Sequence, residues 1–176
     1  MMKSIFTLLY ASLLCVLMAG CTHTVKDKDL VHASYGAADG LLNGVEDKFF
    51  RKQPILVASF VNVDNLQQSS TFGRMIAEQI SSRLAQHNYK VIEMKLRTDS
   101  VFVRAQTGEF LLSREVYEIS SKHDAYSVVV GTYGASKETV YVTAKLLRVR
   151  DGIILSSYDY SLPLGPDTKK MLRKGR

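Results

Sequence analysis

The residues of this chain that could do catalytic or metal chemistry are few and lie far apart in the sequence. They are two cysteines and four histidines: Cys15, Cys21, His23, His32, His87 and His123. No histidine has a second histidine or a carboxylate at a spacing that would place two metal ligands on one face. The motifs of serine hydrolases, zinc proteases, P-loops and dinucleotide-binding loops do not occur. The sequence therefore predicts no catalytic residue, no metal site and no small-molecule substrate, and a protein that is not an enzyme.

Cys21 is the residue whose surroundings point to a defined modification. It follows Leu17-Met18-Ala19-Gly20 at the end of an apolar segment, and Lys3 provides a positive charge before that segment. An apolar segment of about 14 residues is too short to span a bilayer and is typical of a signal peptide. The small residues before Cys21 resemble the lipobox of bacterial lipoproteins, with Met18 where Leu, Val or Ile is usual. The resemblance implies cleavage after residue 20 and a covalent diacylglycerol or acyl lipid on Cys21; an ordinary secretory signal is the alternative.

The cysteine count agrees with lipidation. Removal of residues 1–20 would also remove Cys15, so the mature chain would keep one thiol and form no internal disulfide. Acylation would remove that reactive thiol, and no other cofactor is predicted. In the sorting rule of enteric bacteria, Asp directly after the lipidated cysteine retains a lipoprotein at the inner membrane. Residue 22 is Thr, so we expect delivery to the outer membrane with the domain facing the periplasm. Residues 21–28 are then a short lipidated tether.

The composition is that of one globular domain with a basic end. The chain has 176 residues, of which 46% are hydrophobic and 23% charged, and its net charge is +6. Basic residues gather at the C-terminus: Lys169, Lys170, Arg173, Lys174 and Arg176. Residues 164–176 are therefore predicted to form a solvated basic tail. An exported protein does not meet nucleic acid, which leaves anionic lipid or an acidic cell-wall polymer as an acidic partner.

A helix is predicted for residues 29–52. Its apolar residues recur at intervals of three and four: Val31, Tyr35, Ala38, Leu42, Val45 and Phe49. Gly36, Gly40 and Gly44 form a neighbouring stripe, although each glycine costs a helix about 0.8–1 kcal/mol relative to alanine. The stripe predicts close approach of another backbone, either the domain's own sheet or a helix of a second subunit.

The remaining pattern predicts strands and helices in alternation, then strands alone. Strands are predicted at 55–63, 89–96, 125–133, 139–149 and 153–162, and helices after a cap at 69–71 and at 111–122. For residues 97–110 the pattern allows two predictions, a short strand at 101–103 or a loop. Asp151-Gly152 is typical of a β-hairpin turn. The fold class is therefore α/β (α+β), with a single mixed sheet, βαβ units, an N-terminal helix and a C-terminal antiparallel meander.

Three tyrosines of the meander are candidates for a protein interface. Tyr141, Tyr158 and Tyr160 lie among Thr143, Lys145 and Ser156 on the last two predicted strands. Tyrosine is favoured at interfaces because it joins an apolar ring to a polar tip. Ordinary packing on the sheet is the alternative, and an exposed last strand also offers its edge to a partner strand.

Several segments together resemble one family. They are Ala37–Leu42, Pro54–Val61, Ser70–Ile80, Val130–Tyr133, Val140–Leu147 and Asp151-Gly152. The chain resembles the FlgO family of outer-membrane lipoproteins over residues 29–163, and Phe72-Gly73-Arg74 is the most specific piece. The end of the chain is similar, more loosely, to the TolB N-terminal domain, to CsgG and to lipoprotein activators of penicillin-binding proteins.

The resemblance implies a non-catalytic structural role in motility. FlgO proteins are implied to act at the outer-membrane rings of the flagellar basal body, with FlgP and FlgT, and a homo-oligomer or ring is expected. A lipoprotein activator or scaffold for a cell-wall synthase is the alternative, and an envelope enzyme with an unrecognised motif is a third. The short tether disfavours the activator, which would need a long reach.

Overall fold

The structure, a computed structural model, describes residues 24–45, 52–67, 69–93, 102–104, 110–112 and 114–173. The predicted signal peptide, Cys21 and His23 lie outside these residues, as do residues 46–51 of the helix predicted at 29–52.

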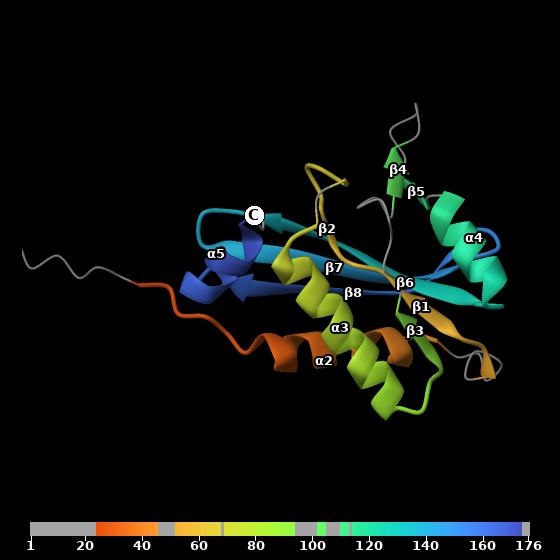
Figure 1. The fold of residues 1–176 in the computed structure, drawn as a ribbon. Coiled ribbons are helices and arrows are strands. Elements are labelled where there is room, and N and C mark those ends of the chain that lie inside the picture. Colours follow the sequence, from red (N-terminus) through yellow and green to blue (C-terminus); the bar gives the residue numbers. More distant parts are fainter. Residues whose placement is uncertain are drawn as a thin grey trace, which may run out of the picture.

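A six-stranded mixed sheet organises the fold (Figure 1). Its order is β3 (Val91–Glu93), β1 (Ile55–Val57), β6 (Ser127–Ala135), β7 (Thr139–Arg148) and β8 (Ile154–Pro163), and β2 (Val61–Asn62) also pairs with β6. Strand β1 is parallel to both β3 and β6, whereas β6, β7 and β8 form an antiparallel meander. The predicted fold class is confirmed. A separate two-stranded antiparallel ribbon, β4 (Phe102–Arg104) with β5 (Phe110–Leu112), is added to the predicted single sheet.

Helices cover both faces of the sheet, but not to the same extent. Helices α2 (Leu30–Asn43) and α3 (Thr71–Gln86) pack on one face, and α4 (Arg114–Lys122) packs on part of the other (Figure 1). The face beneath α2 and α3 receives every second residue of β7. These residues are apolar and buried: Val140, Val142, Ala144 and Leu146. On the α4 side, Val116 is fully buried against Val128 and Val130. The half of that face away from α4 carries no helix in the described part of the chain.

The buried side of α2 differs from the predicted stripe. Its buried residues are Ser34, Ala37, Ala38 and Leu41, whereas Val31 is 44% exposed. Small side chains let the helix axis approach the sheet and α3 closely, which adds dispersion contacts that larger side chains would prevent. The helix is present, but the prediction of its buried face was wrong. The buried residues lie about one position before the predicted ones, for example Leu41 in place of Leu42.

The predicted strand at 55–63 is interrupted. Strand β1 ends at Val57 and β2 begins at Val61, and both pair with β6. Between them Phe60 is fully buried, and its amide donates a hydrogen bond to the Gly73 carbonyl, 3.3 Å away. Residues 55–58, Phe60 and Val61 are buried, whereas Val63 is 38% exposed, because the chain leaves the sheet after β1 to reach α3 and turns away again after β2.

Residues 164–173 do not form the solvated tail that was predicted for residues 164–176, and residues 174–176 lie outside the described part of the chain. Gly165 precedes α5 (Pro166–Leu172), and Leu164, Met171 and Leu172 pack on the main core. Proline at the first helical position, an acid in the first turn and bases in the last turn all favour this helix. The apolar residues between the lysines hold the segment on the domain.

The predicted hairpin at Asp151-Gly152 is confirmed. Strands β7 and β8 pair in antiparallel register around it, and Gly152 adopts φ 70°, which favours glycine. The Arg148 guanidinium bonds Asp151 at 2.9 Å and lowers the pKa of that carboxyl to about 2. The turn is thereby fixed by both backbone conformation and charge.

Candidate functional site

The part of the sheet left bare by α4 is a candidate interface. We call it the open face; it carries Thr132, Tyr141, Thr143, Lys145, Ser157 and Asp159. These residues are neighbours because Thr132 pairs with Thr143, Lys145 with Ser157 and Thr143 with Asp159. Their side chains are hydroxylic, charged or aromatic, and Tyr141 is 60% exposed. A surface of this kind offers hydrogen bonds and one aromatic contact, but no cluster of reactive groups.

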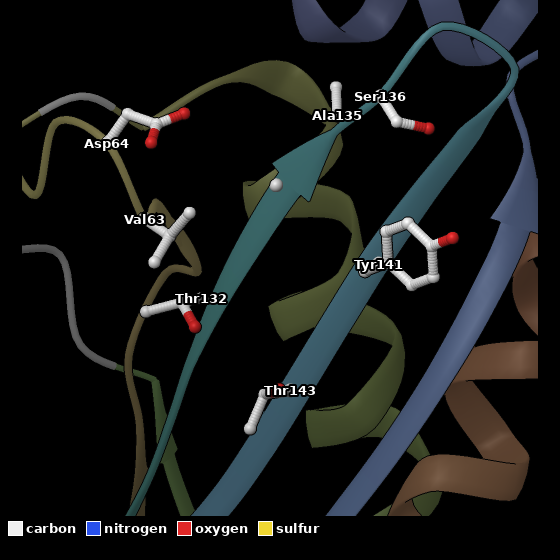
Figure 2. Close-up of a pocket in the computed structure, with 8 residues that line it drawn as sticks. Val63, Asp64, Thr132, Ala135, Ser136, Tyr141 and Thr143 are labelled. Atoms are coloured by element: carbon white, nitrogen blue, oxygen red, sulfur yellow. The ribbon is translucent and has the colours of Figure 1, made fainter.

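A shallow hollow lies beside Tyr141 on the open face (Figure 2). Its volume is about 320 Å³, and Figure 2 shows Tyr141 and Thr143 of β7 across from Val63 and Asp64, with Thr132 between them. Gly134 forms part of its floor, and Val63 Cγ1 would lie 3.2 Å from a Cβ there. Asp64 is the one carboxylate in its lining, without a second carboxylate, a histidine or a lysine to form an acid–base pair, so the arrangement suits polar contact with a partner better than acid–base catalysis.

The three predicted interface tyrosines do not lie together. Tyr158 and Tyr160 pair with Ala144 and Val142, which places them on the face beneath α2, opposite Tyr141. Burial raises the pKa of Tyr160, and the neighbouring Ser34 hydroxyl offsets part of that rise. Grouping all three at one edge was therefore wrong, because the pairing register puts odd and even positions on opposite faces. Any interface role of Tyr141 or Tyr158 stays a prediction.

The three glycines of the predicted stripe on α2 also differ from one another in their surroundings. A Cβ at Gly40 would overlap the Tyr158 ring, and one at Gly44 would overlap the Ser156 hydroxyl. Both glycines therefore let α2 lie close to β8 of its own sheet, which is the packing alternative. No heavy atom lies within 4 Å of a Cβ built at Gly36. Of the three, Gly36 alone keeps space for contact with another molecule.

The described histidines lie at helix ends. His32 is in the first turn of α2, His87 caps the C-terminus of α3, and His123 directly follows α4. In the described part of the chain no three His, Cys, Asp or Glu side chains come together as metal ligands.

His87 belongs to a polar cluster that the sequence analysis missed. Arg83 bonds both oxygens of Asp39, at 2.8 and 2.9 Å, and His87 Nε2 lies 2.8 Å from Asp39 Oδ1. Arg83 also lies over the Tyr35 ring, 5.4 Å from its centroid. The cluster joins α2 to α3 at the surface. Arg83 and His87 stand four residues apart on α3, which was a usable signal, but their partner is more than forty residues away.

This cluster gives a pH-dependent prediction. Arg83 lowers the pKa of Asp39 below 3.8, with His87 adding to the effect and burial opposing it. We expect Asp39→Asn to lower the free energy of unfolding by at most about 1 kcal/mol at pH 7, because the pair is partly exposed. A carboxyl whose pKa is lowered on folding stabilises the fold above its unfolded pKa, so the difference should shrink below about pH 4.

Urea unfolding of both proteins between pH 3 and 7 measures this difference. Asp159→Asn is the matched control, since Asp159 is exposed and makes no ion pair among the described residues. A difference that stays constant down to pH 3 would contradict the assigned ion pair.

A second contact missed by the sequence analysis joins the two ends of the chain. The Asp27 carboxylate accepts hydrogen bonds from the amides of Asp167 and Thr168 of α5, at 2.9 and 3.0 Å. A Cβ at Gly165 would overlap Asp27, so the two segments are in close contact. Asp27 thus caps α5, and the end of the predicted tether is held on the domain. No local pattern predicts a contact across 140 residues.

These features define a small mixed α/β domain with a polar, helix-free area on one face of its sheet. Within the described residues, none of the helices has the length and apolar character needed to cross a bilayer. The fold is similar to that of the LpoB C-terminal domain from Salmonella enterica, at 13% identity and TM-score 0.52, covering 76% of this chain and 98% of that one. The LpoB C-terminal domain from Escherichia coli gives 15% identity and TM-score 0.51, with the same coverage. At these identities the likeness shows the fold alone.

The sequence assigns the chain to a family, which is more specific than a shared fold. The family model for FlgO protein matches residues 35–167, and the chain belongs to this family. Membership indicates a flagellum-associated protein, and the family is non-catalytic. The comparison with curated proteins finds no match.

Proposed function

We propose that the protein is an outer-membrane lipoprotein, anchored through Cys21 with its domain on the periplasmic side. It acts as a non-catalytic structural or assembly component of the flagellar basal body and is required for normal motility. Family membership is the observation that carries this proposal. The polar open face agrees with a binding role.

The contact between Asp27 and α5 limits how far the domain can stand from its membrane. Six residues lead from Cys21 to Asp27, which span at most about 20 Å at 3.3–3.6 Å per residue. A lipid on Cys21 would therefore hold the domain close to the bilayer. This supports a component of the outer-membrane apparatus and disfavours the alternative, an activator that must reach a synthase at the other membrane.

Assembly of this domain into a ring or with other proteins would use the edge strands of its sheet and its exposed side chains. Strand β8 is an edge of the sheet and β3 is the other edge. Head-to-tail contacts between two different surfaces of identical subunits form rings when the rotation from one subunit to the next closes. We propose that the β8 edge, Gly36 and Tyr141 contribute to such contacts, between copies of this chain or with flagellar outer-membrane proteins such as FlgP and FlgT.

Complementation of a deletion strain tests the proposed function. We expect the wild-type gene to restore swimming, and Cys21→Ala to leave swimming at the level of the deletion, because the unlipidated domain is not held at its site. Cys15→Ala is the matched control, since that cysteine lies in the predicted signal peptide. Swimming zones, basal-body images and immunoblots of each strain are the measurements. Normal swimming and intact basal bodies in the deletion strain would refute the flagellar role and direct attention to cell-wall synthesis.

A further inference from the structure

One end of the domain gathers the exposed basic residues of α5 beside the segment that leads to Cys21. We propose that this end docks on anionic lipid headgroups of the membrane that holds the lipid anchor. The proposal rests on the anchoring at Cys21 in the proposed function and adds a defined orientation of the domain. We call the surface the basic end; its residues are Lys26, Lys28, Lys137, Lys169, Lys170 and Arg173.

Three segments meet at the basic end. Asp27 bonds the α5 amides, and the Leu164 amide donates a 2.7 Å hydrogen bond to the Glu138 carbonyl in the β6–β7 hairpin. Figure 1 shows the segment before α2, α5 and this hairpin at the same end of the sheet. The chain therefore enters the domain where α5 lies, so a lipid anchor at Cys21 would bring this end nearest to the bilayer.

Helix α5 presents its basic side chains outward. Thr168 is buried and Met171 and Leu172 pack on the core, whereas Lys169, Lys170 and Arg173 are exposed. Within the described part of the chain none of these three bases makes a salt bridge; the ion pairs there involve Asp39 and Asp151. The three side chains are exposed and can meet an external anion, although Lys169 also interacts electrostatically with the Asp27 carboxylate.

The acids of the same end are fewer and partly engaged. Segments 24–29, 136–138 and 164–173 contain six bases and four acids, Asp27, Asp29, Glu138 and Asp167. The Asp27 carboxylate is occupied by the α5 amides, and Asp29 accepts from the His32 amide at 3.1 Å. Lysine and arginine near an anionic bilayer are attracted within a Debye length, about 8 Å at physiological ionic strength. A tether of at most about 20 Å lets the basic end come within that distance of the bilayer.

Orientation on vesicles tests the docking. Because the acylated chain keeps no free thiol, a single added cysteine can carry a fluorophore: Ser161→Cys marks the basic end, and Ile153→Cys marks the opposite hairpin. Mature lipidated protein is placed in vesicles that contain a headgroup quencher. We expect quenching of the Ser161→Cys label, and not of the Ile153→Cys label, in phosphatidylethanolamine–phosphatidylglycerol vesicles. In phosphatidylcholine vesicles or at high salt the difference between the labels should disappear.

Charge variants separate docking from simple tethering. Each basic residue near an anionic surface raises the equilibrium constant between the docked and undocked domain by about fivefold. The triple variant Lys169→Gln, Lys170→Gln and Arg173→Gln should therefore lower this constant by about one hundredfold. The matched control changes three exposed bases of the opposite end: Lys90→Gln, Lys122→Gln and Arg150→Gln. Asp27→Ala should also reduce quenching, although it makes the domain more basic, because it frees the chain from α5. Circular dichroism of each variant confirms that it is folded.

The outcomes that would overturn the inference are distinct from those for the proposed function. Equal quenching of the two labels, or quenching that the α5 triple variant leaves unchanged, refutes the docking even if Cys21→Ala abolishes swimming. Loss of binding to isolated cell-wall polymer in the triple variant, with lipid quenching unchanged, assigns the basic end to that polymer and also refutes it. Absence of an acyl group on Cys21 by mass spectrometry overturns both the anchoring and the docking.

Discussion

Replacing Gly73 with alanine is expected to lower the free energy of unfolding by about 3 kcal/mol, at the upper end of what overpacking costs. Gly73 lies in the first turn of α3, where its amide donates to the Ser70 hydroxyl at 3.2 Å. A methyl group there would overlap the Phe60 carbonyl oxygen and lie 3.1 Å from the Tyr133 ring. The obstacle is backbone, so relief requires α3 and the segment between β1 and β2 to move apart. That movement would break the hydrogen bond from the Phe60 amide to the Gly73 carbonyl.

Urea unfolding followed by circular dichroism measures this change, and the stripe on α2 offers a matched control. Gly36→Ala makes the same substitution in a helix with no heavy atom within 4 Å. It should raise the free energy of unfolding by about 0.5–1 kcal/mol, since alanine is the better helix former. A Gly73→Ala protein as stable as the wild type would show that α3 does not approach Phe60 this closely.

The architecture was predictable because its signals are local. The alternation of β7, the Asp151-Gly152 turn and the Ser70 cap each depend on residues a few positions apart, and each is present in the structure. Helix α5 also has a local signal, proline and an acid at its start, but only a basic tail was predicted there, from the run of lysines and arginines. A charge run and an amphipathic helix are distinguished by what lies between the charges, and here Met171 and Leu172 pack on the core.

The candidate surfaces were less predictable, because they depend on register and on distant pairs. Whether Tyr141 and Tyr158 share a face is decided by which residues pair across β7 and β8, and a shift of one residue reverses the answer. The contact of Asp27 with α5 and that of Asp39 with Arg83 join segments with no sequence pattern in common. The functional conclusion therefore depends on family membership, while the geometry identifies the surfaces that such a protein can use.

Replacing Gly131 with alanine is expected to cost about 2 kcal/mol for a different reason, and a double-mutant cycle can show it. A Cβ at Gly131 would overlap the ring of Phe60, which is fully buried in the main core. Here the obstacle is a side chain, so a smaller residue at 60 should relieve it. Phe60→Leu alone should lower the free energy of unfolding by about 1–2 kcal/mol, through lost burial.

The double variant Gly131→Ala with Phe60→Leu should then be more stable than the sum of the two single changes by about 1 kcal/mol. The same cycle with Gly73→Ala and Phe60→Leu should give a coupling near zero, because the Phe60 carbonyl remains in place whatever the side chain. Urea unfolding of the five variants and the wild type measures both couplings. Equal couplings would mean that the two glycines respond to the same obstacle, whereas unequal ones would show that Phe60 fixes α3 through its backbone and β6 through its ring.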